Sequence, residues 1–459
     1  MNDNKIRFID LFAGLGGIRL GFEKIFNNLG FQTECVMTSE IKPYAVKTLK
    51  HNFEHGLFFG DIFKVANTDI PDFDFLLGGF PCQPFSAGGK RQGFLDTRGT
   101  LFFEIERILK EKQPYGFILE NVEGLVRHDP EFKSDKIGRT LSTIIYKLET
   151  ELGYHVSWEV LDSLNFGLPQ SRKRIFIVGA KDEKVKLNRF EPRYGKLKDI
   201  LEQNLETIQS DFITKILTHF EINELYGKSI KDKRGGDNNI HSWDIGLKGE
   251  VSQEQSLLLS QLFKERRKKH WAEQIGITWM DGMPLTLNQI QSFHKPTLFD
   301  SNINLKEMLD DLVEKGYLRF EHPKKIVEEQ TENGVRTYRE YDTTKPKGYN
   351  IVTGKLSFEI NKILDPNDIA PTLVATDVSR LAVPDGKGLR RLTTREGLRL
   401  FGYPEWYEIP TKINEAFDLL GNTVAVPVVE YVAEELAEVY IKNVFTLHQE
   451  ELQCAVDSF

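Results

Sequence analysis

The chain is poor in cysteine: Cys35, Cys82 and Cys454 are the only three among 459 residues. An odd number of widely spaced cysteines is not a disulfide framework, and neither cysteine nor histidine recurs at zinc-ligand spacing. No run approaches about 18 consecutive apolar residues, so no transmembrane helix is predicted. The polar N-terminus, Met1-Asn2-Asp3-Asn4, lacks the features of a secretory signal. These absences predict a cytoplasmic protein with no metal site and no membrane partner.

An excess of positive charge is also missing, because 60 lysines and arginines face 68 aspartates and glutamates, for a net charge of −8. This balance argues against a protein that coats nucleic acid non-specifically. It leaves room for a local DNA-binding face, since local patches set the field at a groove. The length predicts two or three domains at roughly 150 residues each.

Residues 6–178 alternate short apolar strands with helical segments. This alternation predicts βαβ units in a doubly wound, mostly parallel α/β sheet, whose ligands bind in the loops at the carboxyl ends of strands. We expect a catalytic and cofactor-binding domain at residues 1–185. A separate mixed α/β domain is expected at 186–387, where the alternation is lost. Residues 388–459 return to the first domain and begin with a helical pattern over 389–400.

A glycine-rich loop, Ala13 to Gly17, joins the first strand to its helix. Glycines let the backbone approach a ligand closely. Glu40, at the end of the next strand, is placed to bind ribose hydroxyls, and Asp61 could meet an adenine amino group. The pattern predicts a nucleoside site that suits S-adenosylmethionine or NAD, with a plain tight turn as the alternative. The dinucleotide fingerprint has a third glycine at the position where this chain has Arg19, which argues against NAD.

Cys82 lies between two prolines, Pro81 and Pro84, which exclude regular helix or sheet. It is therefore expected on a stiff loop at a strand's carboxyl end, where a thiolate is a candidate nucleophile. The glycine- and charge-rich segment up to Arg98 is typical of a loop that covers a substrate. Cys35, inside an apolar strand, fits a small core residue instead.

Two further motifs place charged groups at strand ends. Glu120-Asn121-Val122 ends an apolar strand, where a carboxylate is a candidate for a raised pKa and proton donation. Arg172 and Arg174 face one side of a strand and could hold a phosphate or a base carbonyl. Taken alone, these residues also fit a common strand-end acid and an ordinary exposed basic segment.

The middle region contains helical patterns at 253–269, 285–293 and 305–315, followed by a possible strand at 316–320 and a return strand at 335–341. This order predicts a winged helix-turn-helix, which reads DNA. A helical insertion with a solvated charged face is the alternative. The basic run from Arg266 to Lys269 ends the first helix and predicts phosphate contacts.

Six motifs in this order resemble those of the DNA (cytosine-5)-methyltransferases of bacterial restriction–modification systems. They are the loop from Phe12 to Gly17, Pro81-Cys82-Gln83, Glu120-Asn121-Val122, Gln170 to Arg174, Arg391 to Glu396, and Gly421-Asn422-Thr423-Val424. The resemblance covers about residues 5–185 and 388–445. Residues 186–387 stand where the family has its variable target-recognition region.

The resemblance implies transfer of a methyl group from S-adenosylmethionine to C5 of cytosine in a short duplex DNA sequence, with the base flipped out. It assigns Cys82 as the nucleophile on C6, Glu120 as the partner of N3, and Arg172 and Arg174 as contacts to the ring carbonyl or phosphate. The implied cofactor residues are Phe12, Gly14, Leu15, Gly16, Gly17, Glu40, Ile41, Asp61, Ile62, Pro81, Asn422 and Val424. The expected DNA contacts are Gln83, Ser86, Arg98, Arg266, Arg267, Lys268, Lys269 and Thr372.

The chain departs from the family at Ile41, where many members place an aromatic residue, and at Thr394, where proline is frequent. The resemblance also implies a monomer that acts separately from a cognate restriction endonuclease. Three alternatives stay open: a tRNA cytosine-5 methyltransferase, a non-catalytic DNA-binding regulator on the same fold, and an NAD-dependent oxidoreductase that uses Cys82. The long middle region favours DNA over tRNA, and the intact set of Cys82, Glu120 and Arg174 argues against a regulator.

Overall fold

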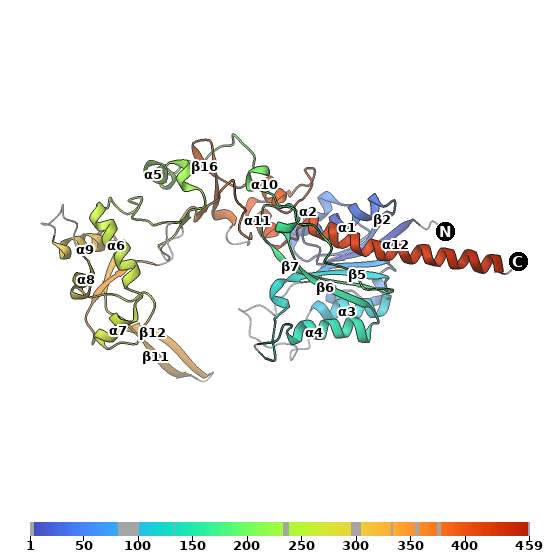
Figure 1. Ribbon diagram of the computed structural model, residues 1–459, viewed down its shortest axis with the longest axis horizontal. Helices are drawn as coiled ribbons and strands as arrows, with labels where there is room; N and C mark the ends of the chain where they lie inside the picture. The colour runs from blue at the N-terminus through green and yellow to red at the C-terminus, as the bar shows by residue number, and fades with distance from the viewer. Residues whose placement is uncertain are drawn as a thin grey trace. The chain divides into compact units, whose positions relative to one another are not determined.

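The computed structural model describes residues 4–80, 101–132, 134–232, 238–294, 304–331, 334–353, 358–373 and 378–457. The chain forms two compact units (Figure 1). Unit 1 comprises residues 1–202, 366–379 and 392–459, and unit 2 comprises residues 203–365 and 380–391. The chain therefore passes between the units more often than the three expected segments suggest.

Backbone hydrogen bonds explain where the boundaries fall. Gly167 N–H donates to Arg193 O at 2.7 Å, which holds the segment after residue 185 on unit 1. Ala370 N–H donates to Pro169 O at 2.7 Å, which holds residues 366–379 there as well. Residues 388–391 instead form a strand of a sheet in unit 2.

Unit 1 is built on a seven-stranded sheet in the order β3-β2-β1-β4-β5-β7-β6. The strands β1 to β5 pair in parallel, whereas β7 is antiparallel to both β5 and β6, so the expected mostly parallel sheet is confirmed. The order reverses between β1 and β4, where sheets of this kind bind ligands. The bounds are β1 (Lys5–Leu11), β2 (Gln32–Ser39), β3 (Leu57–Phe59), β4 (Phe75–Gly79), β5 (Gly116–Val122), β6 (His155–Asp162) and β7 (Lys173–Ala180).

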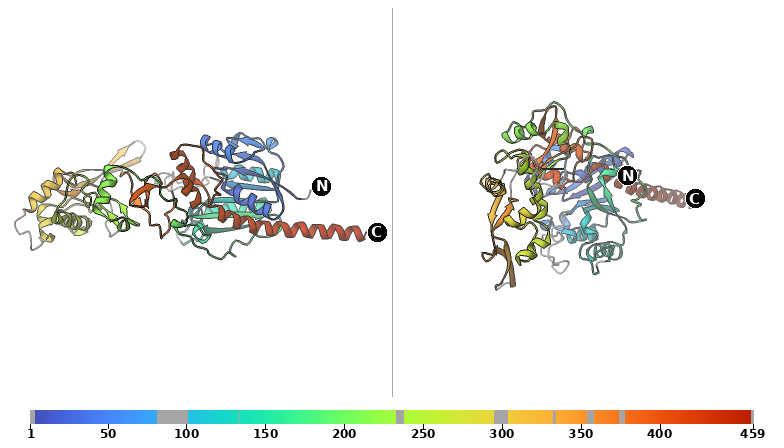
Figure 2. Two further views of the ribbon diagram at one scale, coloured as in Figure 1. Left: turned by 90° about the horizontal axis from the view of Figure 1, so that it is seen from above. Right: turned by 60° about the vertical axis from the view of Figure 1, so that its left-hand side comes forward.

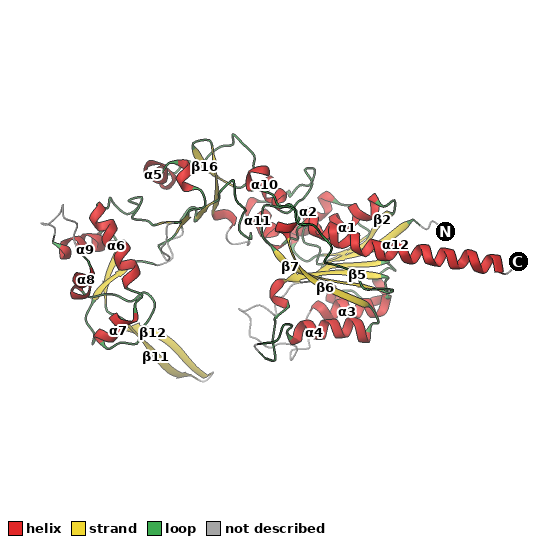
Figure 3. Cartoon of the chain, viewed as in Figure 1, coloured by secondary structure: helices red, strands yellow, loops and turns green. Residues whose placement is uncertain are grey.

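Helices cover both faces of this sheet (Figure 3). Successive side chains of a strand point to opposite faces. In β1, Ile6 and Phe8 therefore pack with α1 (Gly17–Asn28) and α12 (Val426–Asp457), and Ile9 and Leu11 pack with the opposite layer. That layer contains α3 (Leu101–Lys112) and α4 (Arg139–Tyr146). The remaining α-helices among the described residues of unit 1 are α2 (Pro43–Asn52), α10 (Thr394–Leu400) and α11 (Ile413–Asn422).

Small residues bring α1 and α12 close together. A Cβ on Gly17 would stand 2.7 Å from Val424 Cγ2 and from Tyr403 Oη, and one on Gly21 would stand 2.8 Å from Val429. Side chains at these positions would push the helices apart, so the C-terminal part of the chain is fastened directly to the glycine-rich loop. Figure 2 shows α12 continuing beyond the sheet to the C-terminus.

One helical stretch among the described residues, Ile413–Val444, has the length and mean hydropathy (1.2) of a membrane span. Inside the fold 67% of its apolar window is buried. Its apolar residues pack against α1 and the sheet, as in the core helix of a globular fold.

The described residues of unit 2 form two hydrophobic cores. The first lies against α5 (Asp211–His219) and a five-stranded sheet in the order β16-β15-β14-β8-β9. These strands are β8 (Ser229–Ile230), β9 (Asn239–Ile240), β14 (Lys362–Ile363), β15 (Leu381–Asp385) and β16 (Gly388–Arg391). The second core is formed by α6 (Gln253–Glu265), α7 (Lys269–Ile275), α8 (Leu287–Phe293), α9 (Leu305–Glu314), β10 (Leu318–Glu321) and β13 (Gly348–Ile351).

Three expectations for these regions need correction. The helix expected at 253–269 is two helices, because α6 ends at Glu265 and α7 begins at Lys269. The strand at 335–341 does not return to the strand at 316–320. It is β12 (Gly334–Tyr341) and pairs with β11 (Lys324–Thr331), while β10 pairs with β13. The helical pattern after residue 388 begins as strand β16 before α10.

Candidate active site

A cleft of about 1420 Å³ lies at the carboxyl ends of the parallel strands in unit 1. Loops after β1, β2, β3, β4 and β5 contribute to it, together with the start of β7 and the end of α11. Its size exceeds the roughly 300–1,000 Å³ typical of small-molecule pockets. The residues that line it include Phe12, Gly14, Ser39, Glu40, Ile41, Asp61, Ile62, Phe63, Gly79, Phe80, Leu101, Glu120, Asn121, Val122, Arg172, Arg174, Leu419, Gly421 and Asn422.

The glycine-rich loop enters the cleft with an unusual backbone. Phe12 has a φ of 55°, which is left-handed and costs a non-glycine residue about 1–2 kcal/mol. Gly14 and Gly16 also have positive φ values, of 56° and 67°. The N–H of Gly14 donates to Glu40 Oε2 at 2.8 Å, so the loop is tied to the end of β2. Strain of this kind persists where the surrounding structure holds it, and it collects at functional sites.

Two tyrosines from the C-terminal part of the chain hold the glycine-rich loop and the segment next to it in place. Tyr407 Oη donates to Leu15 O at 2.6 Å, and Tyr403 Oη lies 2.5 Å from Thr423 Oγ1. Both tyrosines are buried. The late motifs therefore hold the loop in shape through contacts that the chain order does not reveal.

The loop after β3 supplies an exposed aromatic side chain. Asp61 Oδ1 accepts from the N–H of Phe63 at 3.1 Å and caps the short helix Ile62–Lys64. Phe63 is 49% exposed and Ile41 is 69% exposed, although both line the cleft. Phe63 was not among the predicted residues, and its only sequence signal is an aromatic two positions after Asp61. A flat aromatic ligand could cover these two apolar groups.

Glu120 and Arg174 form a partly buried ion pair in the cleft. Arg174 Nε lies 3.0 Å from Glu120 Oε1, and the two side chains are 18% and 12% exposed. Burial raises the pKa of Glu120 above its usual value, and Arg174 and then Arg172 oppose that rise. Gly79 leaves room for the carboxyl, since a Cβ there would stand 3.4 Å from Glu120 Oε2.

Asn121 fixes the end of the neighbouring strand. Its Nδ2 donates to Phe80 O at 2.9 Å, and its Oδ1 accepts from the N–H of Val122 at 2.8 Å. The prediction assigned Asn121 no contact of its own. The chain leaves β4 at this point toward Pro81 and Cys82, which lie outside the described residues, as do the predicted contacts Gln83, Ser86 and Arg98.

Arg172 joins three segments that are far apart in the sequence. Its guanidinium donates to Leu373 O at 3.2 Å and to Gly421 O at 2.9 Å, and it lies 5.3 Å from the centre of the Phe401 ring. The residue is 3% exposed. Burial, and then the neighbouring Arg174, lower the pKa of Arg172 to about 9. We interpret Arg172 as a positioning residue whose side chain also reaches the cleft.

Replacing Arg172 with methionine should lower the free energy of unfolding by roughly 2–4 kcal/mol, because two buried carbonyl groups lose their donor. Urea denaturation of the full chain measures this change. Lys173→Met is the matched control, since Lys173 is exposed and should change the same quantity by less than about 0.5 kcal/mol. Equal effects of the two substitutions would contradict the role given to Arg172.

The remaining predicted residues of unit 1 take different places. Among the expected cofactor residues, Phe12, Gly14, Glu40, Ile41, Asp61, Ile62 and Asn422 line the cleft. Four others do not line the cleft but pack behind the glycine-rich loop: Leu15, Gly16, Gly17 and Val424. Thr372 lines a smaller hollow of about 420 Å³ beside Lys173 and Arg174, where its hydroxyl donates to Ser171 O at 2.6 Å.

The four residues of the basic run in unit 2, Arg266 to Lys269, differ in their exposure to solvent. Arg266 is 4% exposed, and its guanidinium donates to Asn350 Oδ1 at 2.7 Å. It is therefore held inside unit 2, which corrects the expectation that it contacts phosphates. Lys268 and Lys269 are exposed, and Arg267 is partly exposed.

Comparison with known proteins agrees with this arrangement. A model of the family described as C-5 cytosine-specific DNA methylase matches residues 6–438. The chain belongs to this family. Its chemistry is methylation of cytosine at C5 in DNA, and the resemblance seen in the motifs is confirmed.

Curated relatives match over nearly their whole length. Type II methyltransferase M.NlaIV of Neisseria lactamica is 56% identical over 432 residues, which is 94% of this chain and 99% of the relative. M.NgoBV of Neisseria gonorrhoeae has the same identity and coverage. M.BanI of Aneurinibacillus aneurinilyticus is 41% identical and covers 96% of this chain and 98% of the relative.

Proposed function

We propose that the protein transfers the methyl group of S-adenosylmethionine to C5 of one cytosine in a short duplex DNA sequence. It would thereby protect that sequence from a separate cognate endonuclease of a type II restriction–modification system. The observation that carries this proposal is the partly buried Glu120–Arg174 ion pair, which shares one cleft with the glycine-rich loop. The names of the relatives, Type II methyltransferases, support the biological role. We further infer a monomer in the cytoplasm.

The residues that line the cleft suit the chemistry of the cofactor. Glu40 and Asp61 are carboxylates at the ends of β2 and β3, where they can accept hydrogen bonds from ribose and adenine. Ile41 and Phe63 offer exposed apolar surface for the flat adenine ring. The aromatic ring of Phe63 can therefore make the stacking contact that many family members make with an aromatic residue at the position of Ile41. Phe12 and Asn422 complete the wall. S-adenosylmethionine supplies an electrophilic methyl group when it is bound.

The residues of the chain then make cytosine reactive. In our proposal the Cys82 thiolate forms a bond to C6, and the ring electrons move toward N3 and C5. Glu120 holds a proton at N3, and Arg174 steadies the ring carbonyl. C5 takes the methyl group, and S-adenosylhomocysteine is the leaving group. The C5 proton then passes to a base, the Cys82–C6 bond breaks to release the thiolate, and N3 returns its proton to Glu120, so that aromaticity returns. Cytosine must leave the duplex for this attack.

Unit 2 is proposed as the target-recognition domain, with a winged helix-turn-helix arrangement in its second half. Helices α8 and α9 are followed by β10, the hairpin β11–β12 and β13 in the order of such a domain. An isolated antiparallel bridge joins Leu285 to Tyr349 of β13, which pairs with β10. These pairings support the fold of a DNA-reading unit.

Labelled S-adenosylmethionine, mixed with plasmid DNA or with tRNA, tests the proposal. We expect label in the DNA, and bisulfite sequencing should place it on cytosine in one short recurring sequence. Transfer to tRNA equal to or above that to duplex DNA would overturn the choice of substrate. Tight cofactor binding without transfer to either would indicate a regulator on this fold.

Phe12→Ala and Phe12→Gly should both weaken S-adenosylmethionine binding by roughly tenfold, because both remove a ring that covers apolar ligand surface. The glycine variant should be the more stable of the two by about 1 kcal/mol, since glycine adopts φ = 55° without strain. Isothermal titration calorimetry and thermal unfolding measure the two effects. Unchanged affinity in both variants would remove Phe12 from the cofactor site.

A further inference from the structure

We propose that unit 2 holds the DNA backbone with the junction between α6 and α7 and with the base of the β11–β12 hairpin, while α9 stays off the DNA. This inference rests on the proposed function and assigns a binding surface to it. The surface is called the basic junction below and comprises Arg267, Lys268, Lys269, His270 and Trp279.

Helix α9 has the place of a recognition helix in the chain order but carries the wrong charge. Its buried side, Met308, Leu309 and Leu312, packs into the second core of unit 2. Its other side holds four carboxylates, Glu307, Asp310, Asp311 and Glu314, and few cations. Lys306 is paired with Asp310, and Lys315 at the helix end is paired with Asp311 at 2.7 Å. Such a face repels phosphates instead of binding them.

The basic junction has the opposite character. The side chains of Arg267 and Lys268 are 37% and 53% exposed, and Lys269 and His270 are exposed as well. Carboxylates offset part of this charge, because Lys268 pairs with Glu265 at 2.6 Å and Arg267 pairs with Asp281 at 3.3 Å. Lysines clustered on one surface supply the sequence-independent part of DNA binding.

An exposed aromatic lies among these cations. Trp279 is 39% exposed, and Lys269 Nζ lies 5.5 Å from the centre of its ring. The indole N–H donates to Arg267 O at 3.0 Å, which fixes the ring against the junction. A cation beside a fixed aromatic face suits a sugar–phosphate chain, which offers both charge and apolar surface.

The inward turn of Arg266 explains why the junction keeps its shape. Its guanidinium donates to Asn350 Oδ1 on β13, and it lies 5.3 Å from the centre of the Phe263 ring. This buried side chain ties the break between the two helices to the small sheet. The exposed neighbours are therefore presented from a fixed backbone.

The base of the hairpin continues the surface. A Cβ on Gly276, at the end of α7, would stand 3.3 Å from Lys345 Nζ. Lys347 Nζ lies 5.9 Å from the centre of the Phe320 ring, which is 50% exposed. These two lysines follow the hairpin in the chain and extend the positive surface from α7 to β10.

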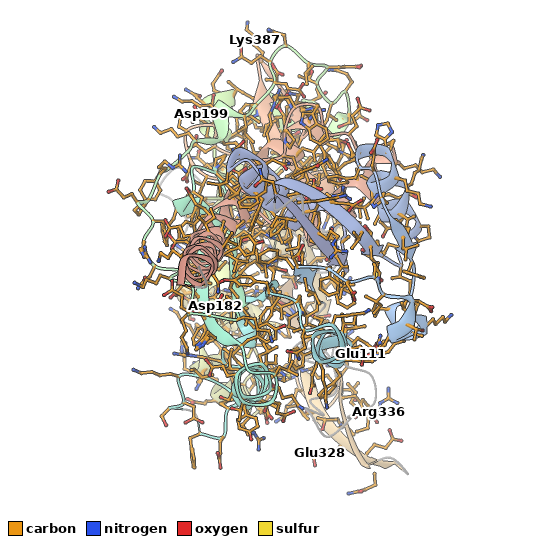
Figure 4. The ribbon with its side chains drawn as sticks, turned by 90° about the vertical axis from the view of Figure 1, so that its right-hand side faces the viewer. Glu111, Asp182, Asp199, Glu328, Arg336 and Lys387 are labelled. Carbon is orange, nitrogen blue, oxygen red and sulfur yellow. The ribbon has the colours of Figure 1, made fainter. Side chains whose placement is uncertain are left out.

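The hairpin further from its base is electrically balanced. Lys325 pairs with Glu340 at 3.0 Å next to the base, and Glu328 and Arg336 lie further out on the two strands, where their opposite charges offset each other (Figure 4). The arm therefore adds little net attraction for phosphates. The hairpin base and the basic junction are left as the phosphate-binding surface.

Salt titration of DNA binding tests the proposal. The probe is a fluorescein-labelled duplex of mixed sequence, with affinity for the full chain measured by anisotropy over a range of salt concentrations. Lys269→Gln should lower the salt slope by about 0.9, and Lys268→Gln with Lys269→Gln by about 1.8, the contributions of one and two phosphates. At about 0.1 M salt this is roughly a tenfold loss of affinity for each contact.

Lys306→Gln on α9 is the matched control, since it removes the same charge from an exposed helical lysine and should leave the slope unchanged. Lys269→Arg should restore the slope of the wild type. An unchanged slope in both junction variants, or an equal change in the control, overturns the inference. Failure of the proposed function has a different signature, because the wild type would then methylate no DNA while its salt slope could still be compared with those of the variants.

Discussion

Replacing Cys82 with serine should abolish methyl transfer, with a fall of at least about 10⁴-fold in rate, as in other enzymes that lose a covalent nucleophile. The reason is the difference in acidity between the thiol and the hydroxyl group. A cysteine thiol is far more acidic than a serine hydroxyl, and its thiolate is the nucleophile, whereas serine needs a dedicated base to become one. Transfer of label from S-adenosylmethionine to plasmid DNA measures the loss, with cofactor binding checked in parallel.

The chain provides its own control in Cys35. This thiol is 5% exposed in β2, and its Sγ lies 3.4 Å from Met37 O and 3.3 Å from Thr38 Oγ1. Burial raises the pKa of Cys35 to about 11, so it is a poor nucleophile at neutral pH. Cys35→Ala should keep the rate of methyl transfer. A rate in Cys82→Ser close to that of the wild type, or a comparable loss in Cys35→Ala, would contradict the assignment.

Local sequence patterns were enough to predict the sheet of unit 1 and much of its site. Strands β1, β4 and β5 contain short apolar runs, and each run is followed by a polar or glycine-rich motif. Parallel strands bring their carboxyl ends to one edge, so Glu40, Asp61 and Glu120 could be placed together before the structure was known. The cleft collects these three residues.

The supporting contacts could not be predicted because they join distant segments. Arg172 bonds to Leu373 O and Gly421 O, and Tyr407 bonds to Leu15 O, across separations that no periodic pattern encodes. Val424 was expected in the cofactor wall but packs on Gly17.

Unit 2 was harder to predict for two physical reasons. Strands as short as Ser229–Ile230 and Asn239–Ile240 have two residues each, which is too few to show alternation. The helix break after Glu265 depends on Arg266 turning inward to Asn350, and a charged residue gives no sign of this in sequence. The same charged run therefore contains one residue that supports the fold and others that face solvent.

Replacing Glu120 with glutamine should lower the rate of methyl transfer by roughly 10² to 10⁴-fold while leaving S-adenosylmethionine affinity unchanged. An amide can donate a hydrogen bond to N3 of cytosine, but it cannot transfer a proton. Glu123→Gln is the matched control, because Glu123 is exposed three positions further along the chain and should keep the wild-type rate.

The pH dependence separates a proton donor from a merely structural carboxylate. Burial raises the pKa of Glu120, so its protonated form persists to higher pH than for an ordinary glutamate. In the wild type, activity should rise with pH as Cys82 ionises and fall as Glu120 loses its proton. Glu120→Gln should lose the alkaline fall and keep the acid limb, since the amide does not titrate. An alkaline fall that persists unchanged in this variant would assign it to another group and leave Glu120 as only the ionic partner of Arg174.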